Sequence, residues 1–120
     1  MKLLLKHISG QIAVFEIANR RVISISIITN GMPTVSTLDN LKFSREGMLE
    51  EFPDLVDMTF TVMKKEAIRR VKAKIAGLAT DEDVATFIVE DFKPHNYSPV
   101  SLERKGFRSK PLNKGVGGKI

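Results

Sequence analysis

The sequence predicts an α+β domain, in which an antiparallel β-meander of three to five strands at the N-terminus packs against one long and one short helix. Three observations lead to this prediction. In the first 40 residues, short apolar runs with strand-like alternation are separated by turn residues. From residue 54 onward, apolar side chains recur every three or four positions, which is the spacing of a helix face. After residue 93, prolines, glycines and lysines replace most apolar residues, which is typical of an extended tail.

The predicted strands are short segments bounded by turn residues. Residues 22–29 have the clearest pattern, because Ile23, Ile25 and Ile27 alternate with other side chains and are therefore expected on one face. Asn30-Gly31 then predicts a tight turn, since both residues tolerate a positive φ. Turns this short join antiparallel neighbours, whereas a parallel crossover needs about a dozen residues. The predicted strands are residues 3–8, 11–17, 22–29 and 35–38, with 41–43 as a further short candidate.

A long helix is predicted over residues 54–76. Its apolar residues recur at helical spacing, Pro53 suits the first helical position, and Gly77 suits the C-terminal cap. The preceding residues 44–51 are compatible with a further turn of helix, although Gly47 weakens that prediction through its conformational freedom.

A second, shorter helix is predicted over residues 81–91. Thr80 and Asp83 resemble a capping box, and apolar residues follow them. The run Phe87-Ile88-Val89 is also compatible with a strand, which leaves an alternative open for this segment. Helices on one side of an antiparallel sheet would cover the apolar faces of both, which is the two-layer arrangement expected here.

The charge of the chain is unevenly distributed. Its 120 residues include 19 Lys and Arg and 14 Asp and Glu, which gives a net charge of +5. Residues 1–97 are balanced, so the whole excess falls in residues 98–120. We therefore expect a single domain over residues 1–93, followed by a basic tail rich in proline, glycine and lysine over residues 94–120.

Composition excludes several kinds of site. Without cysteine, the chain has no disulfide framework, no thiol nucleophile and none of the common structural zinc sites. The two histidines lie near opposite ends of the chain, so we predict no metal and no cofactor. The apolar run at the N-terminus is too short for a signal peptide, and no run approaches the roughly 18 apolar residues of a membrane span. A cytoplasmic protein without a membrane partner is expected.

Two groups of residues could carry catalysis, and neither is favoured. His95 lies in a turn-rich segment with Tyr97, where the preferred interpretation is that Tyr97 docks this segment against the domain. The acidic residues around Asp54 and Asp81 are explained by stabilisation of helix N-termini, which needs no catalytic role. We therefore expect no catalytic residues.

Basic residues are the better candidates for a binding site. Between residues 64 and 74 the predicted long helix carries six basic residues and one acid, and Lys65, Arg69 and Lys72 lie on the face opposite the apolar one. Such a face can contact phosphates. Acidic segments at residues 46–57 and 81–91 flank the helix, and the alternative is that they neutralise it.

The tail places one aromatic ring among several cations. Such a segment can follow a nucleic-acid backbone while the ring stacks on a base, or it can reach a neighbouring subunit. It contains no motif for reading a base sequence, so contact with DNA or RNA would be nonspecific. The tail residues proposed to bind are Arg104, Lys105, Phe107, Arg108, Lys110 and Lys114.

These observations lead to two principal hypotheses. The first is a small non-enzymatic binding module that contacts DNA, RNA or a nucleoprotein partner through the tail and the basic helix face. The alternative is a structural or adaptor subunit of a larger protein assembly, or of a self-association, in which the tail is an arm between subunits. A small enzyme working around His95 is a less favoured third hypothesis.

Overall fold

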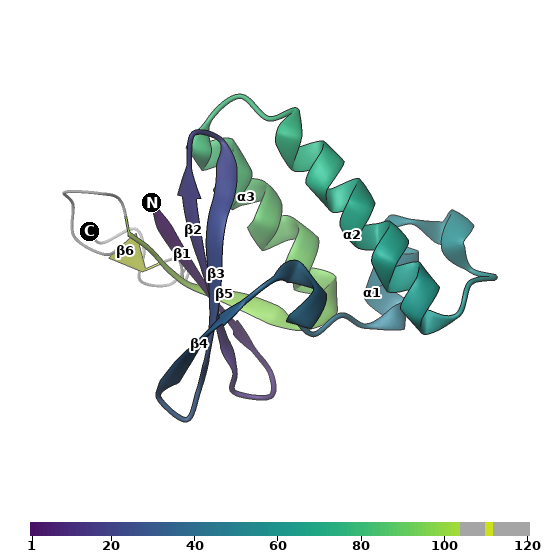
Figure 1. The fold of residues 1–120 in the computed structure, drawn as a ribbon, viewed down its shortest axis with the longest axis horizontal. Coiled ribbons are helices and arrows are strands. Elements are labelled where there is room, and N and C mark those ends of the chain that lie inside the picture. Colours follow the sequence, from purple (N-terminus) through teal and green to yellow (C-terminus); the bar gives the residue numbers. More distant parts are fainter. Residues whose placement is uncertain (104–109, 112–120) are drawn as a thin grey trace.

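The computed structural model describes residues 1–103 and 110–111, which form an antiparallel sheet with helices packed against it (Figure 1). In these ranges the strands are β1 (Lys2–His7), β2 (Ile12–Ala18), β3 (Arg21–Thr29), β4 (Met32–Ser36), β5 (Tyr97–Glu103) and β6 (Lys110–Pro111). The helices are α1 (Arg45–Glu51), α2 (Phe60–Ala76) and α3 (Asp81–Phe92), with 3₁₀ turns η1 (Leu38–Asn40), η2 (Pro53–Leu55) and η3 (Lys93–His95). The predicted α+β class is confirmed.

The strands lie in the order β4-β3-β2-β1-β5-β6, and each neighbouring pair is antiparallel. The first four strands form the predicted meander. The chain then passes through the three helices and returns as β5, which pairs with the other side of β1. The backbone of β6 pairs with β5 at Ser101 and Leu102.

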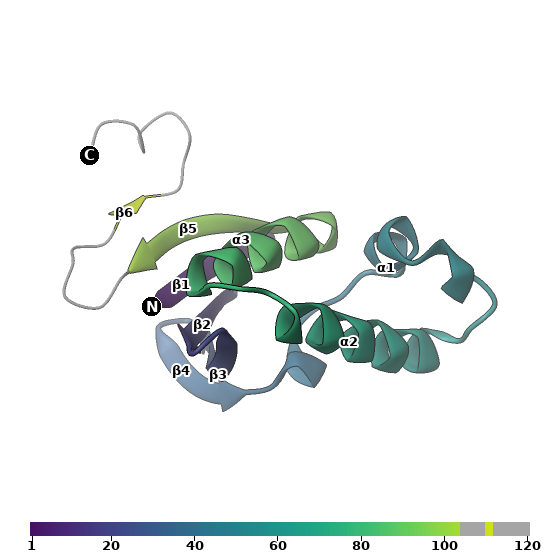
Figure 2. The same cartoon turned by 90° about the horizontal axis from the view of Figure 1, so that it is seen from above.

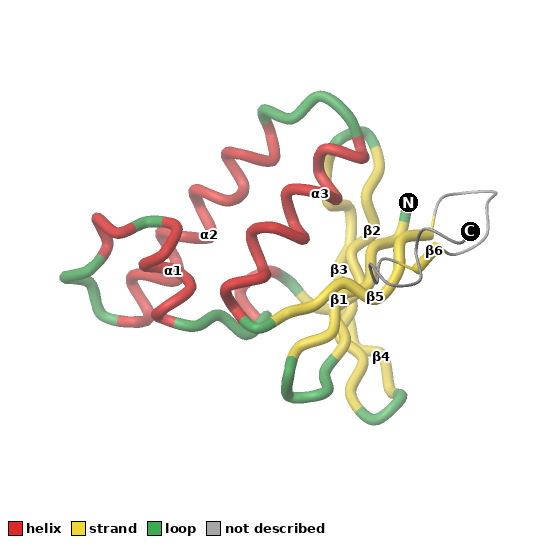
Figure 3. The backbone as a smooth tube through the Cα atoms, turned by 180° about the vertical axis from the view of Figure 1, so that it is seen from behind, coloured by secondary structure: helices red, strands yellow, loops and turns green. Residues whose placement is uncertain are grey.

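The helices cover one face of the sheet, as Figures 2 and 3 show from two directions. The main core lies between this face and the helices α2 and α3, and a smaller cluster joins α1, η2 and α2. Fully burying one large apolar side chain contributes about 1.5–3 kcal/mol, so the main core holds the two layers together and the smaller cluster holds the helical elements to one another. The main core includes Leu3, Leu5, Phe15, Val84, Ile88 and Phe92, and the smaller cluster consists of Met48, Phe52, Leu55, Met63 and Ala67.

The meander turns through residues with positive φ. Asn30 and Gly31, at φ 52° and 78°, connect β3 to β4 as predicted. Asn19 and Arg20, at φ 53° and 61°, connect β2 to β3. Arginine is an uncommon residue in this conformation. Its backbone N–H donates to Oδ1 of Asp81 at 2.7 Å, so the first turn of α3 holds this hairpin in place.

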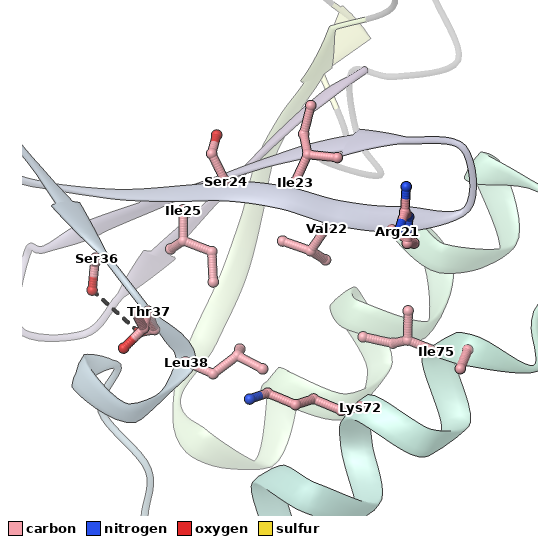
Figure 4. A pocket seen from close by; sticks show the side chains of 11 residues that line it. Arg21, Val22, Ile23, Ser24, Ile25, Ser36, Thr37, Leu38, Lys72 and Ile75 are labelled. Carbon is pink, nitrogen blue, oxygen red and sulfur yellow. Dashed lines mark hydrogen bonds between the residues drawn. The ribbon is translucent and has the colours of Figure 1, made fainter.

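A β-bulge in β3 interrupts the alternation of side chains that the sequence predicts for this strand. Ser24 and Val22 pair with successive residues of β2, which leaves Ile23 as the extra residue. Figure 4 shows Ile23 on the same side of β3 as Ser24, and its side chain is 58% exposed. The prediction that Ile23 shares a face with Ile25 is therefore wrong, because a bulge depends on pairing with a neighbouring strand and leaves no trace in the alternation itself.

The segment after the second hairpin also differs from the prediction. β4 covers Met32–Ser36 instead of residues 35–38, and Pro33 is accommodated because β4 is an edge strand. Residues 41–43 form no strand. Leu41 follows the η1 turn and is buried in the main core, so its apolar character reflects packing of a loop.

The long helix begins later than predicted. Residues 53–55 form the separate turn η2, and α2 starts after Thr59, whose hydroxyl oxygen accepts a hydrogen bond from the N–H of Val62 at 3.4 Å. Apolar spacing runs across this break because η2 and α2 pack into the same small cluster. Its predicted end at Gly77 is confirmed. Residues 45–51 form α1, capped by the side chain of Ser44.

The short helix is confirmed as α3, which settles the alternative of a strand. The Thr80 hydroxyl oxygen accepts a hydrogen bond from the N–H of Asp83 at 3.0 Å, as the predicted capping box requires.

The sheet continues into the segment that was assigned to the tail. β5 pairs with β1 from His7 to Lys2, and Tyr97 and Leu102 are buried in the main core. Proline content suggested a tail there, but Pro94 lies in the turn η3 and Pro99 lies beside a register shift between β1 and β5. Both are places where proline is tolerated.

Candidate functional site

Two arginines on the predicted basic face of α2 are held by acids. Arg69 donates to both carboxylate oxygens of Glu66, at 3.0 and 2.6 Å. Arg70 donates to Glu66 at 2.9 Å and to both oxygens of Asp54 at 2.9 and 2.7 Å. The two guanidinium groups lower the pKa of Glu66 to about 2. Asp54 thus pairs with Arg70 instead of stabilising the start of a helix, and the basic face is partly neutralised.

Two lysines of α2 anchor neighbouring elements. The Lys64 ammonium group donates to the carbonyl oxygens of Asp39 and Leu41 at 2.7 and 3.0 Å and lies 5.4 Å from the centroid of the Phe43 ring. The Lys74 ammonium group lies 3.4 Å from Glu51 and 5.1 Å from the centroid of Phe52. These contacts engage both lysines within the fold, so neither is a free cation for a binding site.

Lys65 and Lys72 remain exposed, and neither forms an ion pair with another residue of the range 1–103. Of the three helix residues proposed for binding, only Arg69 is therefore engaged by an acid. The proposed tail residues Arg104, Lys105, Phe107, Arg108 and Lys114 lie outside the described residues, and for Lys110 only the backbone, in β6, is described.

A groove of about 420 Å³ opens between α2 and β3. Figure 4 shows that Val22 and Ile25 point from β3 into this groove, while Leu38 and Ile75 line its opposite side. The side chain of Lys72 extends along the groove toward Leu38 (Figure 4). Four apolar side chains from three separate elements thus form one surface.

The charge of this groove is positive. Arg21 and Lys72 are exposed members of its lining, and none of the described residues that line it is acidic. Ser36 and Thr37 add polar groups at the end of β4. Ligand sites commonly combine an apolar wall with a few polar groups in a volume of about 300–1,000 Å³. The groove therefore suits an apolar ligand that carries negative charge.

A second pocket, of about 240 Å³, lies between α1 and the C-terminal half of α3, and it is acidic. Asp91 is only 6% exposed, and neither of its carboxyl oxygens accepts a hydrogen bond from a described group. Burial and the neighbouring Glu51 carboxyl raise the pKa of Asp91 far above its ordinary value. Asp91 therefore keeps its proton more readily than an ordinary aspartate. The lining consists of Glu50, Glu51, Phe87, Glu90, Asp91 and Pro94.

His95 and Tyr97 have structural partners. His95 is 2% exposed, and its Nδ1 accepts a hydrogen bond from the N–H of Ser44 at 2.9 Å. The Tyr97 hydroxyl oxygen accepts one from the N–H of Lys42 at 2.9 Å. Burial lowers the pKa of His95 to about 4. Both side chains fasten the loop before α1 to the start of β5, which is the docking interpretation preferred from the sequence.

The described residues offer neither a metal site nor a membrane-spanning helix. Within residues 1–103, no three His, Asp or Glu side chains come together in an arrangement that could hold a metal ion. No helix in the described part of the chain is both long enough and apolar enough to cross a membrane.

Comparisons with protein-family models, with curated proteins and with solved structures find no match to this chain. The function therefore has to be argued from the surface of the molecule itself.

The acidic pocket could be predicted in part from the sequence, whereas the groove could not. Asp91 follows Val84 and Ile88 at helical spacing, so the pattern of α3 already places an acid on its buried face. No such signal exists for the groove. It forms between β3, η1 and α2, which are distant in sequence and meet only in the folded chain.

Proposed function

We propose that this protein is a non-enzymatic binding module that holds an acidic, partly apolar peptide segment of a protein partner in the groove between α2 and β3. The observation that carries the proposal is the combination, in one groove, of an apolar surface with Arg21 and Lys72. This proposal corresponds to the adaptor hypothesis, with the groove in place of the tail as the site of contact.

An extended peptide satisfies both properties of the groove. Its apolar side chains would cover Val22 and Leu38, which are half-buried, and each Å² of apolar surface removed from water contributes roughly 25 cal/mol. Its carboxylates would face Arg21 and Lys72. Opposite charges across an interface speed association and set the orientation of the peptide, so acidic peptides would be preferred.

Nonspecific contact with DNA or RNA is the second candidate. Lys65 and Lys72, without acidic partners in the range 1–103, and the basic residues of the C-terminal segment favour it. The pairing of Arg69 with Glu66 counts against it, because a paired cation replaces fewer counterions on binding. Among the described residues of the groove lining there is also no aromatic ring on which a base could stack.

The test uses three probes with the full chain: a peptide of alternating leucine and glutamate, a peptide of alternating leucine and lysine, and an oligothymidylate. The acidic peptide is expected to bind and to shift the backbone NMR signals of Val22, Ile25 and Ile75. Lys72→Gln should weaken this binding about tenfold, because a charged contact is lost. Lys65→Gln makes the same charge change on the same helix outside the groove, and it should have less than about a twofold effect.

Two results would contradict the proposal. If oligothymidylate binds with a steep salt dependence, and the two lysine variants weaken it equally, nucleic-acid contact is the better account. If neither the acidic peptide nor the oligonucleotide binds at about 50 mM salt, where charged contacts are strong, both candidates are wrong.

A further inference from the structure

The acidic pocket between α1 and α3 forms a second surface with the opposite charge to the groove. We infer that it binds a guanidinium or ammonium group from a basic segment of a protein partner. The inference rests on a buried acid whose oxygens accept no hydrogen bond from a described group, on the charge of the surrounding residues and on two apolar walls.

Asp91 and Glu51 lie close together, so a positive charge beside them would be stabilising. Two neighbouring carboxyl groups that are removed from water cannot both be ionised at low cost, so they require a shared proton or a cation. Burial and Glu51 are the main causes that keep the proton on Asp91. A cation in the pocket would replace that proton and let Asp91 ionise.

The groups that face Asp91 supply little positive charge. Glu50 and Glu51 come from α1 and Glu90 from α3 itself. The buried ring of His95, from η3, is neutral because burial lowers its pKa to about 4. Lys74 of α2 lies 3.4 Å from Glu51, and its charge is the smallest of the causes that act on the pKa of Asp91.

The walls of the pocket favour an organic cation over a metal ion. Fewer than three acidic or histidine side chains converge anywhere in residues 1–103 in a way that suits a metal. Phe87 and Pro94 instead provide apolar contact for the methylene stem of an arginine or lysine, and the Phe87 ring can face its charge. A pocket of about 240 Å³ has room for one such side chain.

The proposal is tested by titrating the full chain with an oligoarginine peptide in a calorimeter, with an oligocitrulline peptide of equal length as the uncharged control. Only the arginine peptide is expected to bind. Asp91→Asn and Glu90→Gln should each weaken binding about tenfold or more. Glu46→Gln, which removes an exposed acid of α1 that does not line the pocket, should change it about twofold or less.

A second readout follows the proton on Asp91. Binding to the wild type should release a proton, so the measured heat should vary with the ionisation enthalpy of the buffer, and this variation should vanish in Asp91→Asn. Equal weakening by Glu46→Gln and Glu90→Gln would overturn the proposal, because the peptide would then respond only to overall charge. Binding of Ca²⁺ without binding of the arginine peptide would also overturn it. Lys72→Gln should leave the binding of the arginine peptide unchanged. This result would distinguish binding at the acidic pocket from binding at the groove.

Discussion

His95 shows how a titratable side chain can serve packing alone. Its ring lies beside the rings of Phe43 and Phe92, with centroids 4.6 and 6.2 Å away, and its Nδ1 accepts a hydrogen bond from Ser44. A doubly protonated ring would place a hydrogen on Nδ1 and lose this bond. The folded protein therefore holds the neutral ring.

The consequence is a loss of stability in mild acid. The pKa of His95 falls from 6.5 to about 4 on folding, so the folded state binds fewer protons than the unfolded state. This contribution is complete above pH 6.5 and is lost as the pH falls toward 4. A shift of this size corresponds to about 3 kcal/mol in the free energy of unfolding, which urea denaturation across this pH range should measure.

His95→Asn is the matched variant, because its side-chain oxygen can take the position of Nδ1 as an acceptor. The wild type should lose more stability than this variant between pH 6.5 and 4. Glu66 also loses a stabilising contribution in acid, because Arg69 and Arg70 lower its pKa. This contribution is the same in both proteins, so the difference between their pH curves reports His95 alone. Parallel pH curves for the two proteins would contradict the role assigned to His95.

At the scale of elements, α1 packs against η3 through a glycine. A Cβ atom added at Gly47 would lie 2.6 Å from Nδ1 of His95 and 2.9 Å from the carbonyl oxygen of Pro94. The residue is buried, and the absence of a Cβ atom is what allows the two elements to approach. From the sequence, Gly47 only weakens the prediction of a helix. Its packing role depends on the contact between α1 and η3, which lies nearly 50 residues later in the chain.

Gly47→Ala should therefore destabilise the protein by about 1–3 kcal/mol, although alanine is the better helix former. Gly77→Ala is the matched control. It changes a glycine at the end of α2, where the nearest atom would be 3.7 Å from the added Cβ and φ is −94°. Thermal unfolding of both variants checks the prediction, and a loss of stability confined to Gly77→Ala would contradict it.

Elements defined by local patterns are the ones that the sequence predicted well. The turn at Asn30-Gly31 and the cap at Thr80 depend on residues within a few positions of each other. The bulge at Ile23 and the place of β5 depend on pairing with distant strands, and the predictions failed there. The candidate site follows the same rule. Lys72 was chosen from its helix face, whereas the apolar surface beside it required β3 and η1.

At the scale of the whole molecule, two separate surfaces carry charges of opposite sign. Residues 1–103 contain 13 Lys and Arg and 14 Asp and Glu, so the described body is close to neutral. The groove beside α2 nevertheless carries Arg21 and Lys72, and the pocket beside α1 carries four acids. A molecule with this distribution can hold partners of opposite charge at separate places.

The limit of the folded body is also testable at this scale. A chain that ends after Glu103 retains β5, whereas a chain that ends after Asn96 lacks the strand that pairs with β1. The shorter chain also loses Tyr97 and Leu102 from the core. We expect a cooperative thermal transition for the chain ending at 103 and none for the chain ending at 96, measured by circular dichroism. Similar transitions for both would show that β5 is dispensable.

The position of β5 also has a consequence during synthesis. β1 is made first and β5 after the helices, so one edge of β1 remains without its neighbour until nearly the whole described body has left the ribosome. That strand contains Leu3, Leu4 and Leu5, and an open apolar edge is prone to pair with other chains. This edge of the first strand is therefore covered only when the last central strand is inserted, and until then the growing chain carries an edge that can pair with other chains.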